Sequence, residues 1–521
     1  MSAHSIFNDV LGPIMCGPSS SHSAGCARIG LMTCKLFGRD IGKANVVFDS
    51  QGSYPETYIG QGSNFGFTGG LLGFTTENPD VKNAVEIAAS LGKQIWFSKE
   101  TLSGRHPNEA RIDVYNERGE VELSVLTFST GGGMFEIVEL NGFPVHIDGT
   151  QEQIFICVTG QGHDALDLIA AGDSADVQRA EQGGKTLYCI SGADAACRRG
   201  VLDLQDEETV EWIRIAPSIM PVPMKKDGRP VFETAEEALA YAEEHQCELW
   251  EAALDYETSI GQVSRQEVWK LAEKTYDVMK RSIVPPDPKT TPLFGFLPYQ
   301  GKEMQEVVME TASVPAGVLH QAALAAIAVM ENSCAHNVVV AAPTAGSSGV
   351  IPAGIIVLGK AMGLPKDLII KGLLTAGLAG AFIANRATFG AEVAACQAEN
   401  GSASCMAAAG ITTLLGGTAR QSFQAASLAL QNMLGLVCDP VGGLTEIPCI
   451  SRNVSAVANA ALSANMVSWG FDPVIPLDET IESMYQVGRQ LPVSLRCTCQ
   501  GGLCQTRTGR RIACELAEKR K

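Results

Sequence analysis

The chain has 521 residues, of which 45% are apolar, and it carries a formal net charge of −18. This charge argues against a nucleic-acid-binding protein, because such binding depends on Lys and Arg side chains that neutralise phosphates. The length predicts two to four domains, and the apolar content is sufficient for sizeable buried cores.

Sixteen cysteines in a chain of this length do not indicate a short secreted scaffold held by disulfides. The N-terminal segment MSAHSIFNDVLGPIM has no basic region and no clean apolar core, so it does not resemble a signal peptide. The uncharged stretch 338–359 contains Pro343, Pro352 and several glycines, which suit a buried turn better than a lipid-exposed span. We therefore expect a cytoplasmic protein with no membrane segment and no nucleic-acid partner.

The first two segments of the chain predict strands. Residues 1–150 contain strand-like runs at 44–49, 110–116 and 121–129 between glycine-rich loops, which indicates an α+β domain. Residues 151–218 alternate regularly and predict the order βαββαβ, with these elements in chain order: strand 154–158, helix 163–172, strands 176–181 and 186–192, helix 193–204 and strand 210–216. That order is typical of a ferredoxin-like or small regulatory-type domain.

The remainder of the chain predicts helices. A proline-spaced linker at 216–230 is followed by Thr234 and Glu237, which form a capping signal for a long helix over 233–254. Ala, Leu, Gly and Met dominate from there on, so residues 231–521 are expected to form an all-α domain. The predicted fold class is thus multidomain α+β, with an α+β domain, a ferredoxin-like domain and an all-α domain in that order.

Three cysteines near the C-terminal end, Cys396, Cys438 and Cys449, each lie beside Gly, Pro, Gln or Asp. Three thiolates can hold an iron–sulfur cluster by three irons and leave the fourth iron as a Lewis acid. Spacing alone leaves alternatives open, because a buried cysteine is more often a small apolar residue. Cys405 competes as a ligand, and a late, more tightly spaced group looks more metal-like, namely Cys497, Cys499 and Cys504.

Two hydroxyl-rich loops are candidates for substrate binding. Residues 17–30 place Ser20, Ser21, His22 and Ser23 before an apolar helix, where free N–H groups suit a carboxylate or phosphate. The alternative is a polar capping loop without a ligand. His22 titrates near neutrality and can act as acid or base, whereas His106, before a proline, is the weaker candidate.

The second loop, 341–353, carries Thr344, Gly346 and Ser347 among glycines. It is not a phosphate-binding P-loop, because the lysine that follows the last glycine of that motif is absent.

Four motifs, GPSSSHSAG, VVVAAPTAGSSGVIPA, AACQAENGSASCMAAAG and LVCDPVGGLTEIPCISRN, resemble signatures of the iron–sulfur-dependent L-serine dehydratases, and the resemblance covers nearly the whole chain. It implies a [4Fe–4S] cluster held by Cys396, Cys438 and Cys449, and conversion of L-serine to pyruvate and ammonia. Cys405 and the late cysteines are then structural. The resemblance also implies an α+β small domain, an optional regulatory-type domain and an all-α domain, with the active site between the first and the last.

The roles of the other site residues follow from the same resemblance. His22 is the first candidate for the base that removes the Cα proton, and His106 is the second. Substrate contacts are expected from the following residues: Ser20, Ser21, Ser23, Asn64, Thr344, Gly346 and Ser347. We also expect a small amino-acid substrate and a homodimer or larger homo-oligomer.

The chain departs from the family pattern at two places. Residues 60–64 read GQGSN where a GHGTD-like stretch is usual, so Gln61 stands in place of a histidine. Residues 496–502 read RCTCQGG where an RETGLGG-like stretch is usual. These changes leave open the related activities of an L-cysteine desulfidase or an L-threonine dehydratase of the same cluster type.

Two readings of other classes are a non-enzymatic iron–sulfur sensor of amino acids and a pyridoxal-dependent lyase. The hydroxyl-rich loops disfavour the sensor, which has no need of them. No lysine lies in a setting typical of a pyridoxal Schiff base, which disfavours the lyase.

Overall fold

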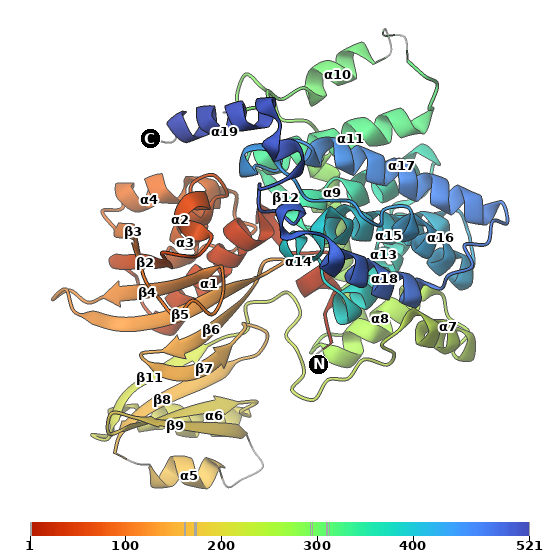
Figure 1. The fold of residues 1–521 in the computed structure, drawn as a ribbon. Helices are drawn as coiled ribbons and strands as arrows, with labels where there is room; N and C mark the ends of the chain where they lie inside the picture. The colour runs from red at the N-terminus through yellow and green to blue at the C-terminus, as the bar shows by residue number, and fades with distance from the viewer. Residues whose placement is uncertain are drawn as a thin grey trace. The chain divides into compact units, whose positions relative to one another are not determined.

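The structure is a computed structural model that describes residues 3–160, 163–170, 175–291, 293, 295–308, 311 and 313–519 (Figure 1). The chain divides into two compact units, and each is taken here by itself. One unit is Ser21–Asp227, and the other combines Met1–Ser20 with Gly228–Lys521.

A six-stranded sheet forms the first half of the unit Ser21–Asp227. Its strands, in spatial order, are β3 (Gln94–Glu100), β2 (Lys43–Asp49), β4 (Glu109–Tyr115), β5 (Val121–Gly131), β6 (Met134–Leu140) and β7 (Phe143–Ile147). Only β2 and β3 run parallel, whereas all other neighbours are antiparallel. The three strands predicted from the sequence correspond to β2, β4 and β5.

Short helices accompany this sheet, and small residues let two of them approach closely. They are η2 (Ser20–Ala24), α1 (Gly25–Phe37), α2 (Tyr54–Thr57), α3 (Ser63–Leu71), η3 (Pro79–Asn83) and α4 (Ala84–Ser90). A Cβ at Gly70 would lie 2.2 Å from the Ala27 carbonyl oxygen, so α1 and α3 pack with their backbones almost in contact. Apolar side chains of α1 and of the sheet share one core.

The segment after β7 has the predicted order βαββαβ: β8 (Gln153–Thr159), α5 (Asp164–Ala170), β9 (Asp176–Gln182), β10 (Lys185–Ser191), α6 (Ala195–Leu202), η4 (Asp203–Asp206) and β11 (Val210–Ala216). The strands form one antiparallel sheet in the order β11-β8-β10-β9. The last two residues of the predicted first helix, 171 and 172, lie outside the described residues.

Strand β8 shows how period-two alternation builds this sheet. Ile154, Ile156 and Val158 pack in one core with residues of α5 and α6. Phe155 and Cys157 point to the opposite face and join the core of the six-stranded sheet. The continuous apolar run of β8 therefore contributes to two cores within this unit, one on each face of the strand.

The second unit is mainly helical. Its N-terminal part contributes η1 (Ile6–Val10) and β1 (Ile14–Cys16), and the remainder contributes α7 (Ala235–Glu244), α8 (Leu249–Ile260), α9 (Arg265–Ser282), α10 (Gly301–Val307), α11 (Val318–Cys334), β12 (Val338–Val340), η5 (Ala345–Ser347), η6 (Pro352–Val357), α12 (Leu358–Ala361), α13 (Lys366–Arg386), α14 (Ala391–Cys396), η7 (Gln397–Gly401), α15 (Ser402–Leu414), α16 (Ala419–Gln431), η8 (Val441–Gly443), α17 (Cys449–Ser468), α18 (Leu477–Gln490), η9 (Val493–Leu495), η10 (Gly502–Gln505) and α19 (Arg507–Lys519). Helix α15 packs against α13, α16 and α17. A Cβ at Gly410 would lie 2.6 Å from the Gly372 carbonyl oxygen, so α13 and α15 need small residues at their crossing.

Two details of this unit differ from the sequence prediction. The long helix expected over 233–254 is broken into α7 and α8, because Gln246 adopts a positive φ of 52° between them. The domain is not entirely α-helical, since β1 pairs antiparallel with β12, with Ile14 opposite Val340. Helix α13 is long and apolar enough to cross a membrane, but most of it is buried inside the protein, as in the core helix of a soluble protein.

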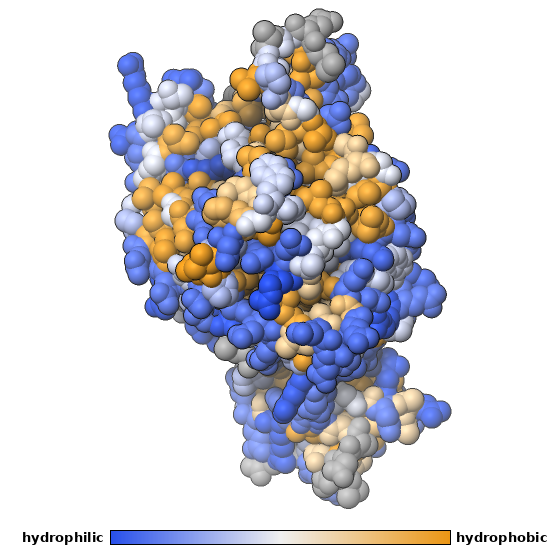
Figure 2. Space-filling view, turned by 90° about the vertical axis from the view of Figure 1, so that its right-hand side faces the viewer, coloured by the Kyte–Doolittle hydropathy of each residue, from blue (hydrophilic) through white to orange (hydrophobic). Residues whose placement is uncertain are grey.

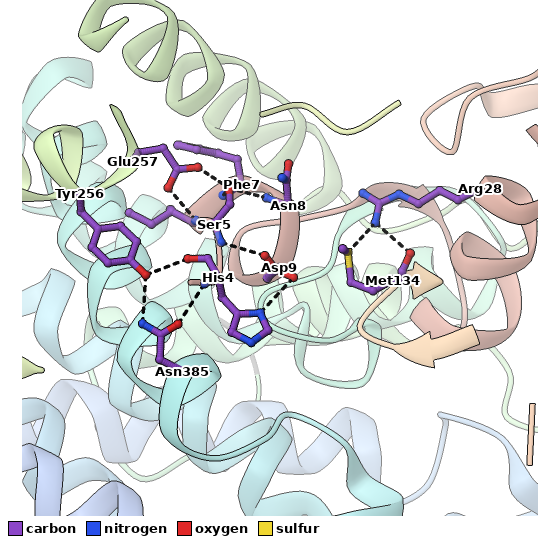
Figure 3. A network of polar contacts seen from close by, with 12 residues as sticks. His4, Ser5, Phe7, Asn8, Asp9, Arg28, Met134, Tyr256, Glu257 and Asn385 are labelled. Carbon is purple, nitrogen blue, oxygen red and sulfur yellow. Dashed lines mark hydrogen bonds and ion pairs between the residues drawn. The ribbon is translucent and has the colours of Figure 1, made fainter. Parts of the chain in front are cut away.

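The N-terminal segment is fixed to the helical unit by a buried carboxylate (Figure 3). Glu257 of α8 is fully buried and accepts hydrogen bonds from the Ser5 hydroxyl and from the Ile6 N–H at 2.8 Å. The hydroxyl of the neighbouring Tyr256 donates to the His4 carbonyl at 2.9 Å. Burial raises the pKa of Glu257 to about 7, although its hydrogen bonds oppose the shift.

This carboxylate should make the stability of the helical unit depend on pH. The pKa of Glu257 is higher in the folded chain than in the unfolded chain, so the folded state binds the proton more tightly. The free energy of unfolding should therefore fall as the pH rises from about 4.5 to about 7, by up to roughly 3 kcal/mol. Glu257→Gln should remove this pH-dependent part of the free energy of unfolding. Denaturant unfolding at a series of pH values would measure the change. Glu244→Gln, on an exposed position of α7, is the control. If Glu257→Gln changed the free energy of unfolding by the same amount at every pH, the prediction would be contradicted.

Candidate metal centre

Cys396 lies where the backbone bends between two helical segments. Ala395, just before it, has a φ of 61° and a ψ of −168°, an uncommon conformation for a residue other than glycine. This bend separates α14 from the helical run of η7 and α15, which begins at Cys396. A thiolate at the start of a helix is favoured by the positive end of the helix dipole.

Cys449 lies in an equivalent setting, and Cys438 is held by a different one. Cys449 is the first residue of α17. Cys438 forms an isolated parallel bridge with Arg496, in which its N–H donates to the Leu495 carbonyl at 2.8 Å. The three thiols are buried, with exposed fractions of 1%, 3% and 6% for Cys396, Cys438 and Cys449.

A carboxylate joins this group. One atom each from Cys396, Glu399 and Cys438 lies within 4.8 Å of the other two, as ligands of one metal ion would. The Cys396 thiol donates to Glu399 Oε2 at 3.6 Å, because the two residues are three apart on one helical run. Cys449 interacts electrostatically with both Cys396 and Glu399.

The second hydroxyl-rich loop reaches the same carboxylate. The Thr344 hydroxyl donates to Glu399 Oε1 at 2.8 Å and lies 3.2 Å from the Ser347 hydroxyl. A Cβ at Gly346 would lie 2.9 Å from Glu399 Oε1, so glycine allows this approach. The structure thus brings Thr344, Gly346 and Ser347 to Glu399, the carboxylate that accepts from the predicted cluster ligand Cys396.

Arg452 places a positive charge beside the thiols. It lies three residues after Cys449 on α17 and donates to Asp439 Oδ1 at 2.8 Å and to the Val437 carbonyl at 2.8 Å. Its guanidinium also lies 3.6 Å from the Cys396 sulfur. A fixed cation in contact with a sulfur stabilises the negative charge of a thiolate or of a thiolate-ligated cluster.

The chemistry of this donor set fits a thiol-ligated metal cluster. Hydrogen bonds with the thiols of Cys396 and Cys497 raise the pKa of Cys438 well above its usual range, and burial does the same for Cys449. Burial also raises the pKa of Glu399 to about 7. Thiols that resist ionisation when crowded together are deprotonated when a metal replaces their protons, so the group is suited to a cation.

The other cysteines that spacing alone left as candidate ligands differ in their surroundings. Cys405 is fully buried inside α15, and burial raises the pKa of its thiol. Cys497 lies against Cys438: its N–H donates to the Cys438 carbonyl at 3.0 Å and the two thiols hydrogen-bond each other. Cys499 and Cys504 contact each other instead, and the Cys504 sulfur lies 3.0 Å from the carbonyl oxygen of Pro440.

His22, in the unit Ser21–Asp227, belongs to a separate polar network. Its Nδ1 lies 3.0 Å from the Ser21 hydroxyl and its Nε2 lies 3.2 Å from the Ser53 hydroxyl. Ser53 donates to Asn108 Oδ1, and the Asn108 amide donates to the Ser129 carbonyl at 3.3 Å. The Ser53 proton is thus directed away from His22, which favours the tautomer with Nε2–H and an unprotonated Nδ1 that faces the Ser21 hydroxyl.

Burial lowers the pKa of His22 to about 4, so the imidazole is neutral at pH 7. His106 is connected to the same network, because its Nδ1 accepts the Asn108 N–H at 3.0 Å, and its ring stacks on Phe128. The structure therefore brings together the two histidines that the sequence named as candidate bases.

Two further predicted substrate residues lie near this network. The Ser23 hydroxyl donates to the Gln61 carbonyl at 2.9 Å, which joins the first hydroxyl-rich loop to the segment where the chain departs from the family pattern. Asn64 Oδ1 is buried and has no hydrogen-bond partner among the described residues. A buried acceptor without a donor suits a ligand that brings one. Ser20 begins η2 and is buried.

Sequence reasoning missed two residues of the metal centre. Glu399 and Arg452 each lie three residues after a predicted ligand, so the spacing of one helical turn would have indicated both. Cys497 was named from its spacing as a competing ligand, and the structure places it against Cys438 through pairing of two loops that are distant in the sequence.

Together these features define a protein with a thiol-rich candidate metal centre in a helical unit and a histidine network in an α+β unit. Residues 244–504, about half of the chain, match the family model described as serine dehydratase alpha chain. The chain belongs to this family.

Several known proteins are similar to the chain. The probable L-serine dehydratase alpha chain of Bacillus subtilis (strain 168) is 34% identical over 282 residues, which are 54% of this chain and 94% of that protein. The L-serine dehydratase alpha chain of Peptoniphilus asaccharolyticus is 34% identical over 284 residues, 54% of this chain and 96% of that protein. The probable L-serine dehydratase beta chain of Bacillus subtilis (strain 168) is 44% identical over 156 residues, 30% of this chain and 69% of that protein.

Proposed function

We propose that this chain is an L-serine dehydratase, a lyase that converts L-serine to pyruvate and ammonia. The observation that carries the proposal is the convergence of Cys396, Cys438 and Glu399 with the Thr344 loop, in a chain of the serine dehydratase family. The names of the similar alpha and beta chains support the same activity.

The proposed cofactor is a [4Fe–4S] cluster held by Cys396, Cys438 and Cys449. When bound by three thiolates, such a cluster supplies a Lewis-acidic iron for the β-hydroxyl that leaves the substrate. Arg452 balances part of the negative charge of the thiolates, and its contact with Asp439 fixes its position. Cys396 and Cys449 lie at helix starts, where the positive end of the helix dipole stabilises a negatively charged thiolate.

His22 is the proposed base for the Cα proton, which its Nδ1 would receive. Its low pKa keeps that nitrogen unprotonated near neutrality, and the Ser21 hydroxyl beside it can pass or hold the proton. Hydroxyls and amides are the proposed contacts of the substrate carboxylate and ammonium, from the following residues: Ser20, Ser21, Ser23, Asn64, Thr344, Gly346 and Ser347. His106 is kept as the second candidate base.

The proposed domains are residues 1–150, 151–218 and 231–521. The strand order β11-β8-β10-β9 supports a ferredoxin-like middle domain of regulatory type.

We further propose a cytoplasmic homodimer or larger homo-oligomer. Figure 2 views the side on which α17 ends, with apolar patches among hydrophilic residues. The segment after α17 exposes Trp469 and Val474 by 75% and 76%, which supports an assembly.

The test is an anaerobic purification followed by iron and sulfide analysis, an absorption spectrum and assays of 2-oxo acid from L-serine, L-threonine and L-cysteine. We expect a brown protein that is most active on L-serine, loses activity in oxygen and regains it with ferrous iron and a reductant. A preference for L-cysteine or L-threonine would change the substrate, and an inactive iron–sulfur protein would favour the amino-acid sensor. A colourless, fully active protein would exclude the cluster.

A further inference from the structure

Cys499 and Cys504 form a thiol pair outside the proposed ligand set. Their sulfurs lie within hydrogen-bonding distance of one acceptor, the Pro440 carbonyl oxygen, at 3.5 Å for Cys499 and 3.0 Å for Cys504, and the two thiols also contact each other. Both are free thiols in the structure. Cys504 is buried, whereas Cys499 is half-buried, so only one member of the pair is open to a reagent in solvent.

The loop that carries the thiol pair is held in one conformation. Cys499 and Gly502 have positive φ values of 54° and 61°, and η10 places Cys504 back over Cys499. The Gln505 amide closes the loop by donating to the Cys499 carbonyl at 2.6 Å. The Leu503 N–H donates to Asp439 Oδ2 at 2.8 Å, which fixes the loop to the segment after Cys438. Thiols held in contact by a closed loop need little movement to form a bond.

The surroundings of Cys499 favour a nucleophilic sulfur. The Cys504 thiol and the Gly443 N–H both hydrogen-bond the Cys499 sulfur, and the contact with Cys504 lowers the pKa of Cys499 to about 7. The same contact raises the pKa of Cys504. Because Cys499 is half-buried and Cys504 is buried beside it, Cys499 is the thiol that a reagent from solvent meets and Cys504 is the thiol placed to resolve, which is the division of roles in a redox-active pair.

We propose that Cys499 and Cys504 are a reversible redox modification site that small-molecule disulfides oxidise to an intramolecular disulfide. The Cys499 thiolate attacks one sulfur of a disulfide such as oxidised glutathione, a mixed disulfide forms and one glutathione thiolate leaves. Cys504 then loses its proton and attacks the Cys499 sulfur, and the second glutathione thiolate leaves. Two protein thiols are oxidised, and one glutathione disulfide is reduced to two thiols.

Oxidation would leave no S–H group against the Pro440 carbonyl, two residues beyond Cys438. The redox state of the thiol pair would thus change the hydrogen bonding of the segment that carries the proposed cluster ligand Cys438. The disulfide itself does not depend on the proposed function, because a chain without a cluster contains the same pair.

The experiment incubates the full chain, purified anaerobically, with oxidised glutathione, blocks free thiols with a maleimide and maps tryptic peptides without reduction. Trypsin cuts after Arg496 and Arg507, so one peptide holds Cys497 together with the thiol pair. We expect that peptide to carry one maleimide on Cys497 and an internal disulfide between Cys499 and Cys504, which dithiothreitol reverses. Three maleimides, a stable glutathione adduct, a bound metal ion on the pair or a disulfide that involves Cys497 would overturn the proposal.

Single variants add a second readout. In Cys504→Ser the mixed disulfide at Cys499 has no resolving thiol, so its glutathione adduct should accumulate roughly tenfold above the unaltered chain. In Cys499→Ser no adduct should form at Cys504. Cys514→Ser changes an exposed cysteine on α19 and should leave the internal disulfide intact. Equal adduct levels in the unaltered chain and in Cys504→Ser would contradict the assigned roles. Iron and sulfide analysis of the same samples reports separately on the proposed cluster.

Discussion

Cys438→Ala abolishes bound iron, acid-labile sulfide and L-serine dehydratase activity together. Cys438 contributes one of three proposed ligands, and its sulfur lies within 4.8 Å of Cys396 Sγ and a Glu399 oxygen. Two thiolates in place of three leave a second iron of the cluster unsupported, so the cluster is lost as a whole. Metal analysis, the absorption spectrum and an anaerobic pyruvate assay measure the three quantities on one preparation.

The matched control is Cys497→Ala, which removes the thiol that hydrogen-bonds Cys438. If Cys497 is a neighbour and Cys449 is the third ligand, this variant keeps its iron and sulfide, whereas Cys449→Ala loses both. The opposite result would exchange the roles of Cys449 and Cys497. Full activity of an iron-free Cys438→Ala protein would refute the cluster.

His22→Ala lowers kcat by roughly 10²–10⁴-fold, the usual contribution of a positioned acid or base. Its iron and sulfide content stays at the level of the unaltered enzyme, which separates a missing base from a missing cluster. His146→Ala is the control, because its side chain is 67% exposed on β7. A normal kcat in His22→Ala would transfer the role to another group, and His106→Ala would be the next variant.

The pH dependence of kcat/KM gives an independent check of His22. A base must be unprotonated to act, and burial lowers the pKa of His22 to about 4. Activity limited by this group is therefore retained as the pH falls through the usual histidine range and is lost only near pH 4. An activity loss centred near pH 6.5 would show that the base is not the buried His22.

Local sequence patterns were sufficient to predict many of the helices and strands. The βαββαβ order of the segment after β7 follows from short apolar runs such as Ile154–Val158, because a strand with two buried faces is apolar at every position. The capping pair of Thr234 and Glu237 marked the start of α7, where the Thr234 hydroxyl accepts the Glu237 N–H at 3.1 Å. The break at Gln246 was missed because helix propensity on both sides is high and a single positive φ has no strong sequence signal.

The sequence by itself determined the chemistry that is available to this protein: the thiols of Cys396, Cys438 and Cys449, the hydroxyl-rich loops and the histidines. Only the tertiary structure decided which of these groups meet. Glu399 reaches Thr344 through a hydrogen bond between side chains, and Cys497 reaches Cys438 through a loop bridge; in both cases the two segments lie far apart in the chain. The physical reason is that spacing along a chain reports only local neighbours, whereas contacts between distant segments depend on how helices and loops pack.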